Sequence, residues 1–125
     1  MPAEIDQFVV KVTTAGVAGS ASGNADTDDL VHGEIEDIFL DYHASAPATT
    51  DVTISFKDRG GNVLVVSNNA TDGLYHPRAK PVDNANAAIT NAHTKYACHQ
   101  KLNVAVAQAD ALTDCVTAYI RVRRP

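Results

Sequence analysis

The spacing of apolar and polar positions along this chain is that of short β-strands. Near the C-terminus, Leu102, Val104 and Val106 alternate with more polar neighbours, and residues 116 to 122 repeat the pattern. Successive side chains of a strand point to opposite faces, so each run has one face suited to a core. The turn-prone residues 109 to 114 lie between the two runs, and we predict an antiparallel hairpin with one buried face.

The beginning of the chain divides into a predicted strand and a predicted loop. Phe8, Val10 and Val12 alternate with polar residues across positions 5 to 14, which favours a strand. Residues 15 to 29 are rich in Gly, Ala, Ser, Asn and Asp and lack this alternation. Such a composition predicts a mobile loop or the hinge of an arm, outside the core.

The apolar pattern changes phase in the middle of the next strand. Val31 and Ile35 share one phase, whereas Ile38 and the apolar residues after it share the other. One extra residue near positions 36 and 37 would return both sets to one face, so we predict a β-bulge there, or two strands that meet at a bend. The same pattern also fits a Phe39 that is buried on the second face.

A hairpin is also predicted for residues 51 to 66. Val52, Ile54 and Phe56 alternate inward, and two consecutive glycines lie in the connection that follows. Glycine adopts the positive φ angles that tight hairpin connections need. The returning segment, residues 63 to 66, is continuously apolar, which permits cover on both faces.

The segment between residues 74 and 100 is the least regular part of the chain. Pro77 and Pro81 lack the N–H that a strand ladder needs, so we expect an edge strand or an extended strap. From residue 83 to residue 100, several alanines permit a short helix. The interspersed Thr and Asn residues favour an irregular loop, which is the interpretation we prefer.

These segments amount to about six to eight short strands with little helix. We therefore predict an all-β fold, a single-domain antiparallel β-sandwich or jelly roll. With 125 residues, 45% of them hydrophobic, the chain is long enough for one core. Within this domain we expect an N-terminal strand or arm (residues 1–14), a Gly/Ala/Asp-rich loop (residues 15–29) and a sandwich body (residues 30–125).

Charge is unevenly distributed along the chain and limits the partners that fit it. The formal net charge is −5, made up of −8 over residues 1–60 and +3 over residues 61–125. Such halves could attract each other between copies, whereas an acidic protein is a poor partner for nucleic acid. No apolar run approaches the roughly 20 residues that span a bilayer, so we expect no membrane partner. The N-terminus lacks a secretory pattern, which favours synthesis in the cytoplasm.

Four residues have the chemistry of zinc ligands but not the spacing. His93, Cys98, His99 and Cys115 contain no CxxC or HxxxH pair, which zinc sites of this kind usually have. Two cysteines are too few for a disulfide scaffold, and we predict two reduced, buried thiols rather than a bridge. We assign no metal ligand and no cofactor.

Two further groups imitate functional motifs. Residues 24 to 29 place oxygen-bearing side chains as at the start of a calcium loop, but the Gly and Glu that an EF-hand needs further on are missing. Asp41, His43 and Ser45 supply the residue types of a hydrolase. Neighbours in one loop rarely adopt triad geometry, and no G-x-S-x-G sequence is present. We assign no catalytic residue and predict that the protein is not an enzyme.

Three arginines mark the last predicted strand and its end: Arg121, Arg123 and Arg124. As an exposed charged edge, they would discourage unwanted strand pairing. Their guanidinium groups are equally suited to bidentate pairs with acidic loops of a neighbouring subunit. The sequence leaves these two interpretations open.

Three segments carry a resemblance to known proteins: residues 40–54, residues 72–78 and residues 104–110. Their strand and turn motifs resemble those of small β-rich virion proteins of tailed bacteriophages. The resemblance implies a virion component, in particular a capsid decoration (cement) protein, commonly a homotrimer. Its expected partners are the major capsid protein and further copies of itself, and its expected location is the capsid surface.

The resulting functional hypothesis is a structural protein that binds the outer surface of the assembled head as a symmetric oligomer and stabilises it. Another virion subunit, of the neck, tail or head fibre, fits the same observations. A third interpretation is a carbohydrate-binding β-sandwich, in which four tyrosines would supply stacking surfaces: Tyr42, Tyr75, Tyr96 and Tyr119.

Overall fold

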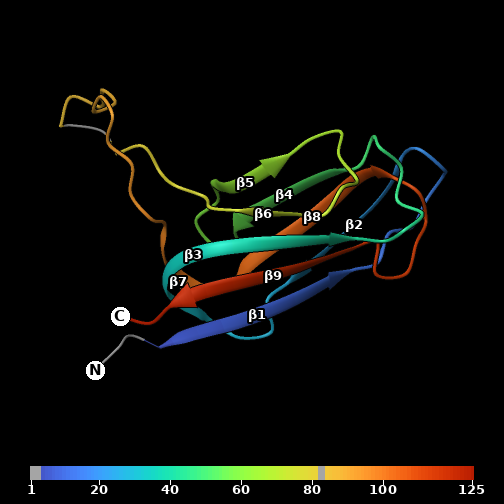
Figure 1. Ribbon diagram of the computed structural model, residues 1–125, viewed down its shortest axis with the longest axis horizontal. Helices are drawn as coiled ribbons and strands as arrows, with labels where there is room; N and C mark the ends of the chain where they lie inside the picture. Colours follow the sequence, from blue (N-terminus) through green and yellow to red (C-terminus); the bar gives the residue numbers. More distant parts are fainter. Residues whose placement is uncertain (1–3, 82–83) are drawn as a thin grey trace.

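The computed structural model describes residues 4–81 and 84–125, and these residues form two antiparallel sheets that pack face to face (Figure 1). They contain nine strands and no helix. The strands are β1 (Ile5–Val12), β2 (Ala21–Asp26), β3 (Val31–Tyr42), β4 (Asp51–Phe56), β5 (Asn62–Val66), β6 (Gly73–Tyr75), β7 (Ala97–Gln100), β8 (Leu102–Ala109) and β9 (Val116–Arg123). The predicted all-β sandwich is confirmed, with slightly more strands than expected.

One sheet has the strand order β1-β9-β3-β6, with β7 also paired to β3, and is named here the β9 sheet. The other has the order β2-β8-β4-β5 and is named the β8 sheet. The core lies between them and takes alternate residues from both. Its largest fully buried side chains are Ile35, Ile38, Leu40, Ile54, Leu102, Ile120, Val12, Val31, Val52, Val104, Val106 and Val116.

The predicted hairpin near the C-terminus is wrong, because β8 and β9 belong to different sheets. The connection between them crosses from one sheet to the other and is held by Thr14. The Thr14 hydroxyl donates to the Asp110 carbonyl oxygen at 2.5 Å and accepts from the Leu112 N–H at 3.1 Å. An alternating pattern shows which face of a strand is buried. It does not show whether two such strands pair side by side in one sheet or face each other across the core, because the pattern is the same in both cases.

The phase change in β3 is a β-bulge, as predicted. The register between β3 and β9 shifts between Ile35 and Asp37, and the apolar residues before and after the shift, Ile35 and Ile38, are both buried in the core. The alternative in which Phe39 is buried on the second face is wrong. Phe39 is half-buried and lies on the outer face of the β9 sheet, where its ring packs near Tyr119.

The predicted loop at residues 15–29 contains strand β2, which pairs with β8 along the edge of the β8 sheet. The missing apolar alternation has a physical cause at Gly23. A β-carbon at Gly23 would overlap the carbonyl oxygen of Thr13, so the close approach of these two segments requires glycine. Gly23 therefore indicates close packing of two backbones.

The β4–β5 hairpin is confirmed. Gly60 and Gly61 in its connection have φ angles of +77° and +94°, as the turn geometry predicts. The expectation that residues 63 to 66 are covered on both faces is wrong, because β5 is an edge strand and Val65 is 54% exposed.

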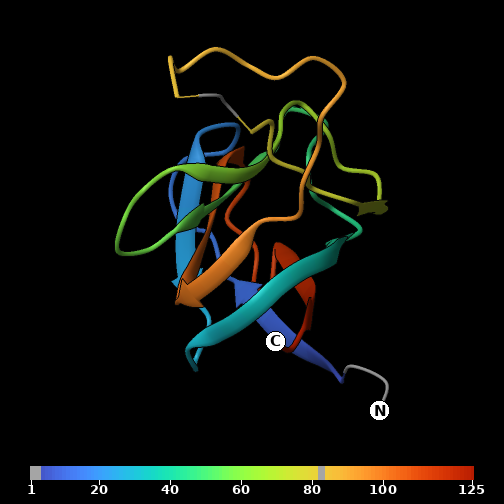
Figure 2. The same ribbon diagram turned by 90° about the vertical axis from the view of Figure 1, so that its left-hand side faces the viewer.

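Between β6 and β7 the chain leaves the sandwich as a projecting arm, defined here as residues 76–96 (Figures 1 and 2). Antiparallel bridging of Ala79 and Thr94 joins its two sides near the base. The predicted strap after an edge strand matches β6 and the arm's first residues. The predicted loop at residues 83–100 ends earlier than expected, because Ala97–Gln100 is strand β7; Asp83 itself lies outside the described residues.

Candidate assembly surfaces

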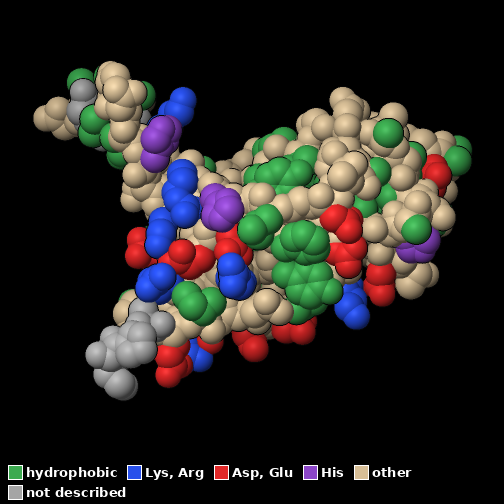
Figure 3. All heavy atoms as spheres, in the orientation of Figure 1, with side chains coloured by type: hydrophobic (Ala, Val, Ile, Leu, Met, Phe, Trp, Pro, Cys, Tyr) green, Lys and Arg blue, Asp and Glu red, His purple; other side chains and the backbone are tan. Residues whose placement is uncertain are grey.

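A row of apolar side chains crosses the outer face of the β9 sheet. The strand registers place Val9 beside Tyr119, Tyr119 beside Phe39, and Phe39 beside Leu74. Val9 is 44% and Leu74 51% exposed, and the Phe39 and Tyr119 ring centroids are 6.2 Å apart. These four residues are named the apolar row; hydrophobic side chains gather over the middle of this face in Figure 3. Adjacent exposed apolar residues on a flat sheet are typical of a contact surface.

Charged side chains flank the apolar row on both sides. On one side, Arg121 Nε donates to Asp37 Oδ1 at 2.8 Å, and a second contact makes the pair bidentate. Asp37 is only 5% exposed, whereas the Arg121 side chain is about half exposed. On the other side, the register places Lys11 and Asp41 on either side of Thr117. On this face the cations therefore lie on β1 and β9, and the carboxylates lie on β3.

Of the two sequence-based interpretations of the arginines, the one that makes them an exposed edge is wrong, and pairing with a neighbouring subunit stays a prediction. Strand β9 lies between β1 and β3, so it is not an edge strand that needs protection from pairing. Each arginine is paired within its own chain: Arg121 with Asp37, Arg123 with Glu36, and Arg124 with Glu4 and Asp6. The hydrogen bond from Arg124 lowers the pKa of Asp6. These ion pairs tie β1 and β3 to the central strand and offer no unpaired guanidinium to a neighbour.

Glu36, in the β-bulge, anchors the arm to the sandwich. Its Oε1 accepts from Lys95 Nζ at 2.6 Å and from Arg123 Nε at 2.5 Å, and its carbonyl oxygen accepts from Arg78 Nη1 at 3.2 Å. Arg78 and Lys95 lie at the two ends of the arm, so one residue holds both of its sides. The hydrogen bonds from Lys95 and Arg123 lower the pKa of Glu36 from 4.5 to about 2.

Replacing Glu36 with glutamine is expected to make the protein less stable at neutral pH and to change its acid response. Because its pKa is lowered on folding, the Glu36 carboxylate contributes stability above about pH 4.5 and loses it as the pH falls toward 2. Both cations are partly exposed, so we expect a loss of about 1 kcal/mol at pH 7. Urea unfolding at pH 7 and pH 2.5 measures this. Glu34→Gln, the same change at an exposed position of β3, is the control, and equal effects of both variants would contradict the assignment.

The arm is the cationic part of an acidic protein. Its sequence contains Arg78, Lys80 and Lys95, two histidines and a single acidic residue, Asp83. In Figure 3, Lys, Arg and His side chains gather where the arm meets the sandwich. Positive charge at the base of a projection from a negatively charged body is suited to an acidic surface of another molecule.

A shallow groove of about 750 Å³ lies beside β7. Within it, the His32 and His99 rings stack with centroids 4.2 Å apart, and the Arg59 guanidinium lies 5.1 Å from the centre of the Phe56 ring. The groove is lined by His32, Gly33, Glu34, Asp58, Arg59, Ala97, Cys98, His99, Gln100 and Pro125. Gln100 Oε1 holds its wall by accepting from the backbone N–H groups of Asp58 and Arg59 at 2.7 and 3.1 Å.

The residues with zinc-ligand chemistry do not converge. His93 lies in the arm, Cys98 and His99 in β7, and Cys115 directly before β9, at the end opposite the contact of β7 with β3. Both thiols are buried and free, as predicted, and burial raises the pKa of each. No group of three or more His, Cys, Asp or Glu residues in the described ranges is arranged to hold a metal.

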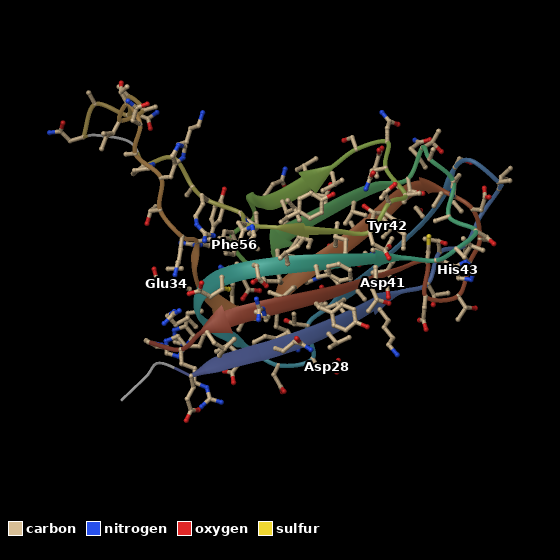
Figure 4. All side chains as sticks on the ribbon, in the orientation of Figure 1. Asp28, Glu34, Asp41, Tyr42, His43 and Phe56 are labelled. Atoms are coloured by element: carbon tan, nitrogen blue, oxygen red, sulfur yellow. The ribbon has the colours of Figure 1, made fainter. Side chains whose placement is uncertain are left out.

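The residues that resemble a calcium loop and a hydrolase triad make structural contacts in the fold. Asn24 and Asp26 lie in β2, where Asp26 accepts from Asn103 Nδ2 at 2.8 Å and pairs with Lys57. Asp41 and His43 lie at the end of β3 (Figure 4), and His43 Nδ1 accepts from the backbone N–H of Ser45 at 3.0 Å. The imidazole therefore stabilises a turn in this arrangement.

Three of the four tyrosines proposed as glycan-stacking surfaces face the core. Tyr42 is 6% exposed, and Tyr75 and Tyr96 pack partly buried against the core cluster. Tyr119 alone of the four lies on the outer sheet face, within the apolar row. The tyrosines thus form no common platform.

Across the described part of the chain, the structure has no helix of the length and apolarity needed to cross a bilayer.

Comparison with known proteins identifies no family. No family model matches the chain, and no curated protein matches it. Among solved structures, the chain is similar to FlhE, with 16% identity, a TM-score of 0.44 and coverage of 98% of this chain and 97% of that one. It is also similar to a Y46A mutant of the family 29 carbohydrate-binding module CBM29-2, with 10% identity, a TM-score of 0.38 and coverage of 94% and 78%. At these values neither protein's role transfers to this chain.

Proposed function

We propose that this protein is a structural subunit of a bacteriophage virion, a decoration (cement) protein that binds the assembled capsid and stabilises it. The observation that carries the proposal is the cationic arm, which projects from a rigid sandwich and is fastened at its base by Glu36. The resemblance of three sequence segments to phage virion proteins supports it. In this role the protein acts by binding and performs no reaction.

The proposed mechanism divides the work between the arm and the sandwich. The arm reaches across a boundary between capsid subunits and places Lys80 against an acidic surface of the major capsid protein. Charge complementarity favours the encounter and fixes the orientation. Each contact is small, but many copies on a symmetric shell, each linked to its neighbours, raise the total binding strength.

The proposal predicts that reversing one arm charge weakens capsid binding. Lys80→Glu should lower the affinity for capsids that lack the protein by about tenfold, since a favourable charge contact becomes a repulsive one. Cosedimentation with such capsids measures this, and the temperature at which filled heads release DNA should fall in parallel. Lys101→Glu, the same charge change at an exposed position on the sandwich body, is the control.

Two outcomes would contradict the proposal. If wild-type protein neither bound capsids nor raised the temperature of DNA release, cementing would be wrong. If it occurred in a few copies per particle and not in hundreds, the neck, tail or head-fibre interpretation would replace it.

A further inference from the structure

We infer that the outer face of the β9 sheet binds the same face of a second copy about a twofold axis parallel to the strands. The inference rests on the proposed function for the role of the resulting dimer, but its geometry follows from the sheet alone. The apolar row lies open to solvent on this face, and the arm does not cover it (Figure 3). A second copy is the occupant because the face is complementary to itself.

The apolar row is self-complementary through the strand order. An axis that runs between β9 and β3 exchanges these two strands, and it also exchanges β1 with β6. Val9 then lies against Leu74 of the second copy, and Tyr119 against Phe39 of the second copy. Two such sheets keep their strands aligned, which is a common way for sheets to pack.

The charges distinguish this axis from the alternative. With the axis parallel to the strands, the Arg121–Asp37 pair of one copy lies opposite the same pair of the second copy, but Asp37 is only 5% exposed and already paired, so this row contributes little to the choice of axis. Asp41 of the second copy lies opposite Thr117, and Lys11 lies on the strand next to Thr117. The long Lys11 side chain is therefore within reach of that Asp41. An axis across the strands would instead place Lys11 opposite Gln7 of the second copy and away from its Asp41. The contact between Lys11 and Asp41 therefore favours the axis parallel to the strands.

The size of the face sets the expected strength. Four strands about 4.8 Å apart, with about five residues each, present roughly 300 Å² of projected area. This is well below the roughly 800 Å² per partner of a standard stable interface. The isolated dimer should therefore be weak, with a dissociation constant on the order of 100 µM, and should become fully formed where a particle holds two copies side by side.

Sedimentation equilibrium of the purified protein between about 10 µM and 1 mM tests the inference. We expect a monomer–dimer equilibrium. Leu74→Ser should weaken the dimer by about tenfold, because each of the two contacts between Val9 and Leu74 loses its leucine side chain. Val65→Ser is the matched control, because Val65 is exposed to a similar extent (54% against 51%) but lies on the β8 sheet. It should leave the equilibrium unchanged.

A charge exchange tests the orientation. Lys11→Glu and Asp41→Lys should each weaken the dimer, and the double variant should restore it, because the two side chains come within reach of each other only with the axis parallel to the strands. A protein that remains monomeric up to 1 mM, forms a trimer, or loses association equally with Val65→Ser would overturn the inference. If the protein bound capsids but stayed strictly monomeric, this interface would be refuted and the cementing role would stand. If it formed the dimer but bound no capsid, the cementing role would be refuted and the interface would stand.

Discussion

Gly33→Ala is expected to lower the free energy of unfolding by roughly 3 kcal/mol, enough to unfold a large fraction of a marginally stable domain. A β-carbon at this position would overlap the carbonyl oxygen of Arg123 and lie 2.9 Å from Val122 Cγ1. Gly33 also has a φ angle of +139°, which residues with side chains rarely adopt. Backbone cannot yield as a flexible side chain can, so β3 would have to separate from the end of β9.

Gly60→Ala separates the cost of the steric overlap at Gly33 from the cost of its positive φ angle. Gly60 has a φ of +77° in the β4–β5 connection, but a β-carbon there would meet no atom within 4 Å. This variant should therefore lose only the conformational part, about 1 kcal/mol. Urea unfolding of both variants at pH 7 provides the comparison. Equal losses would mean that strain in φ alone explains Gly33 and that the tight contact with Arg123 relaxes at little cost.

The fold class could be predicted from the sequence because alternation is a local property of each strand. Even the bulge in β3 was predictable, since Ile35 and Ile38 cannot share a face without an extra residue. Strand partnership was not predictable in the same way. β8 and β9 follow one another and have the same pattern. They nevertheless lie in different sheets, because the connection after Ala109 passes from one sheet to the other.

The candidate surfaces were harder to predict than the fold. Val9, Phe39, Leu74 and Tyr119 are far apart in sequence and become neighbours only through the order β1-β9-β3-β6. In each strand the outward residue looked like an ordinary solvent-facing position. The arginines were singled out correctly as important, but their partners could not be foreseen, because Glu36 and Asp37 reach the same side only through the bulge. Surface function here depends on registers between strands, which alternation alone does not specify.

The same dependence explains why the sequence predicts only a strap and an irregular loop where the structure has an anchored arm. Its prolines disfavour ladder pairing, and its Thr and Asn residues favour an irregular loop, which the composition indicates. What the composition does not indicate is that both sides of the arm return to one residue of β3. The anchoring by Glu36 converts an irregular segment into a projection with a fixed origin.

Ile120→Ala should lower the stability of the fold without changing the outer face of β9 that we propose for assembly. Ile120 is fully buried in the middle of β9, where it lies between Phe8 of β1 and Ile38 of β3. Truncation leaves a cavity between two sheets, and we expect a loss of about 3 to 4 kcal/mol in the free energy of unfolding, measured in urea. Protein that remains folded should keep its outer face and therefore its tendency to dimerise.

Tyr119→Ala, one residue earlier on the same strand, should have the opposite profile. Its side chain lies in the apolar row and is already partly exposed, so its loss should cost clearly less stability than that of Ile120. It should nevertheless abolish dimerisation in the sedimentation experiment, because Tyr119 faces Phe39 of the second copy at the centre of the proposed interface. If Tyr119→Ala unfolded the protein as readily as Ile120→Ala, the outer face would be part of the structural core, and its proposed role in assembly would have to be abandoned.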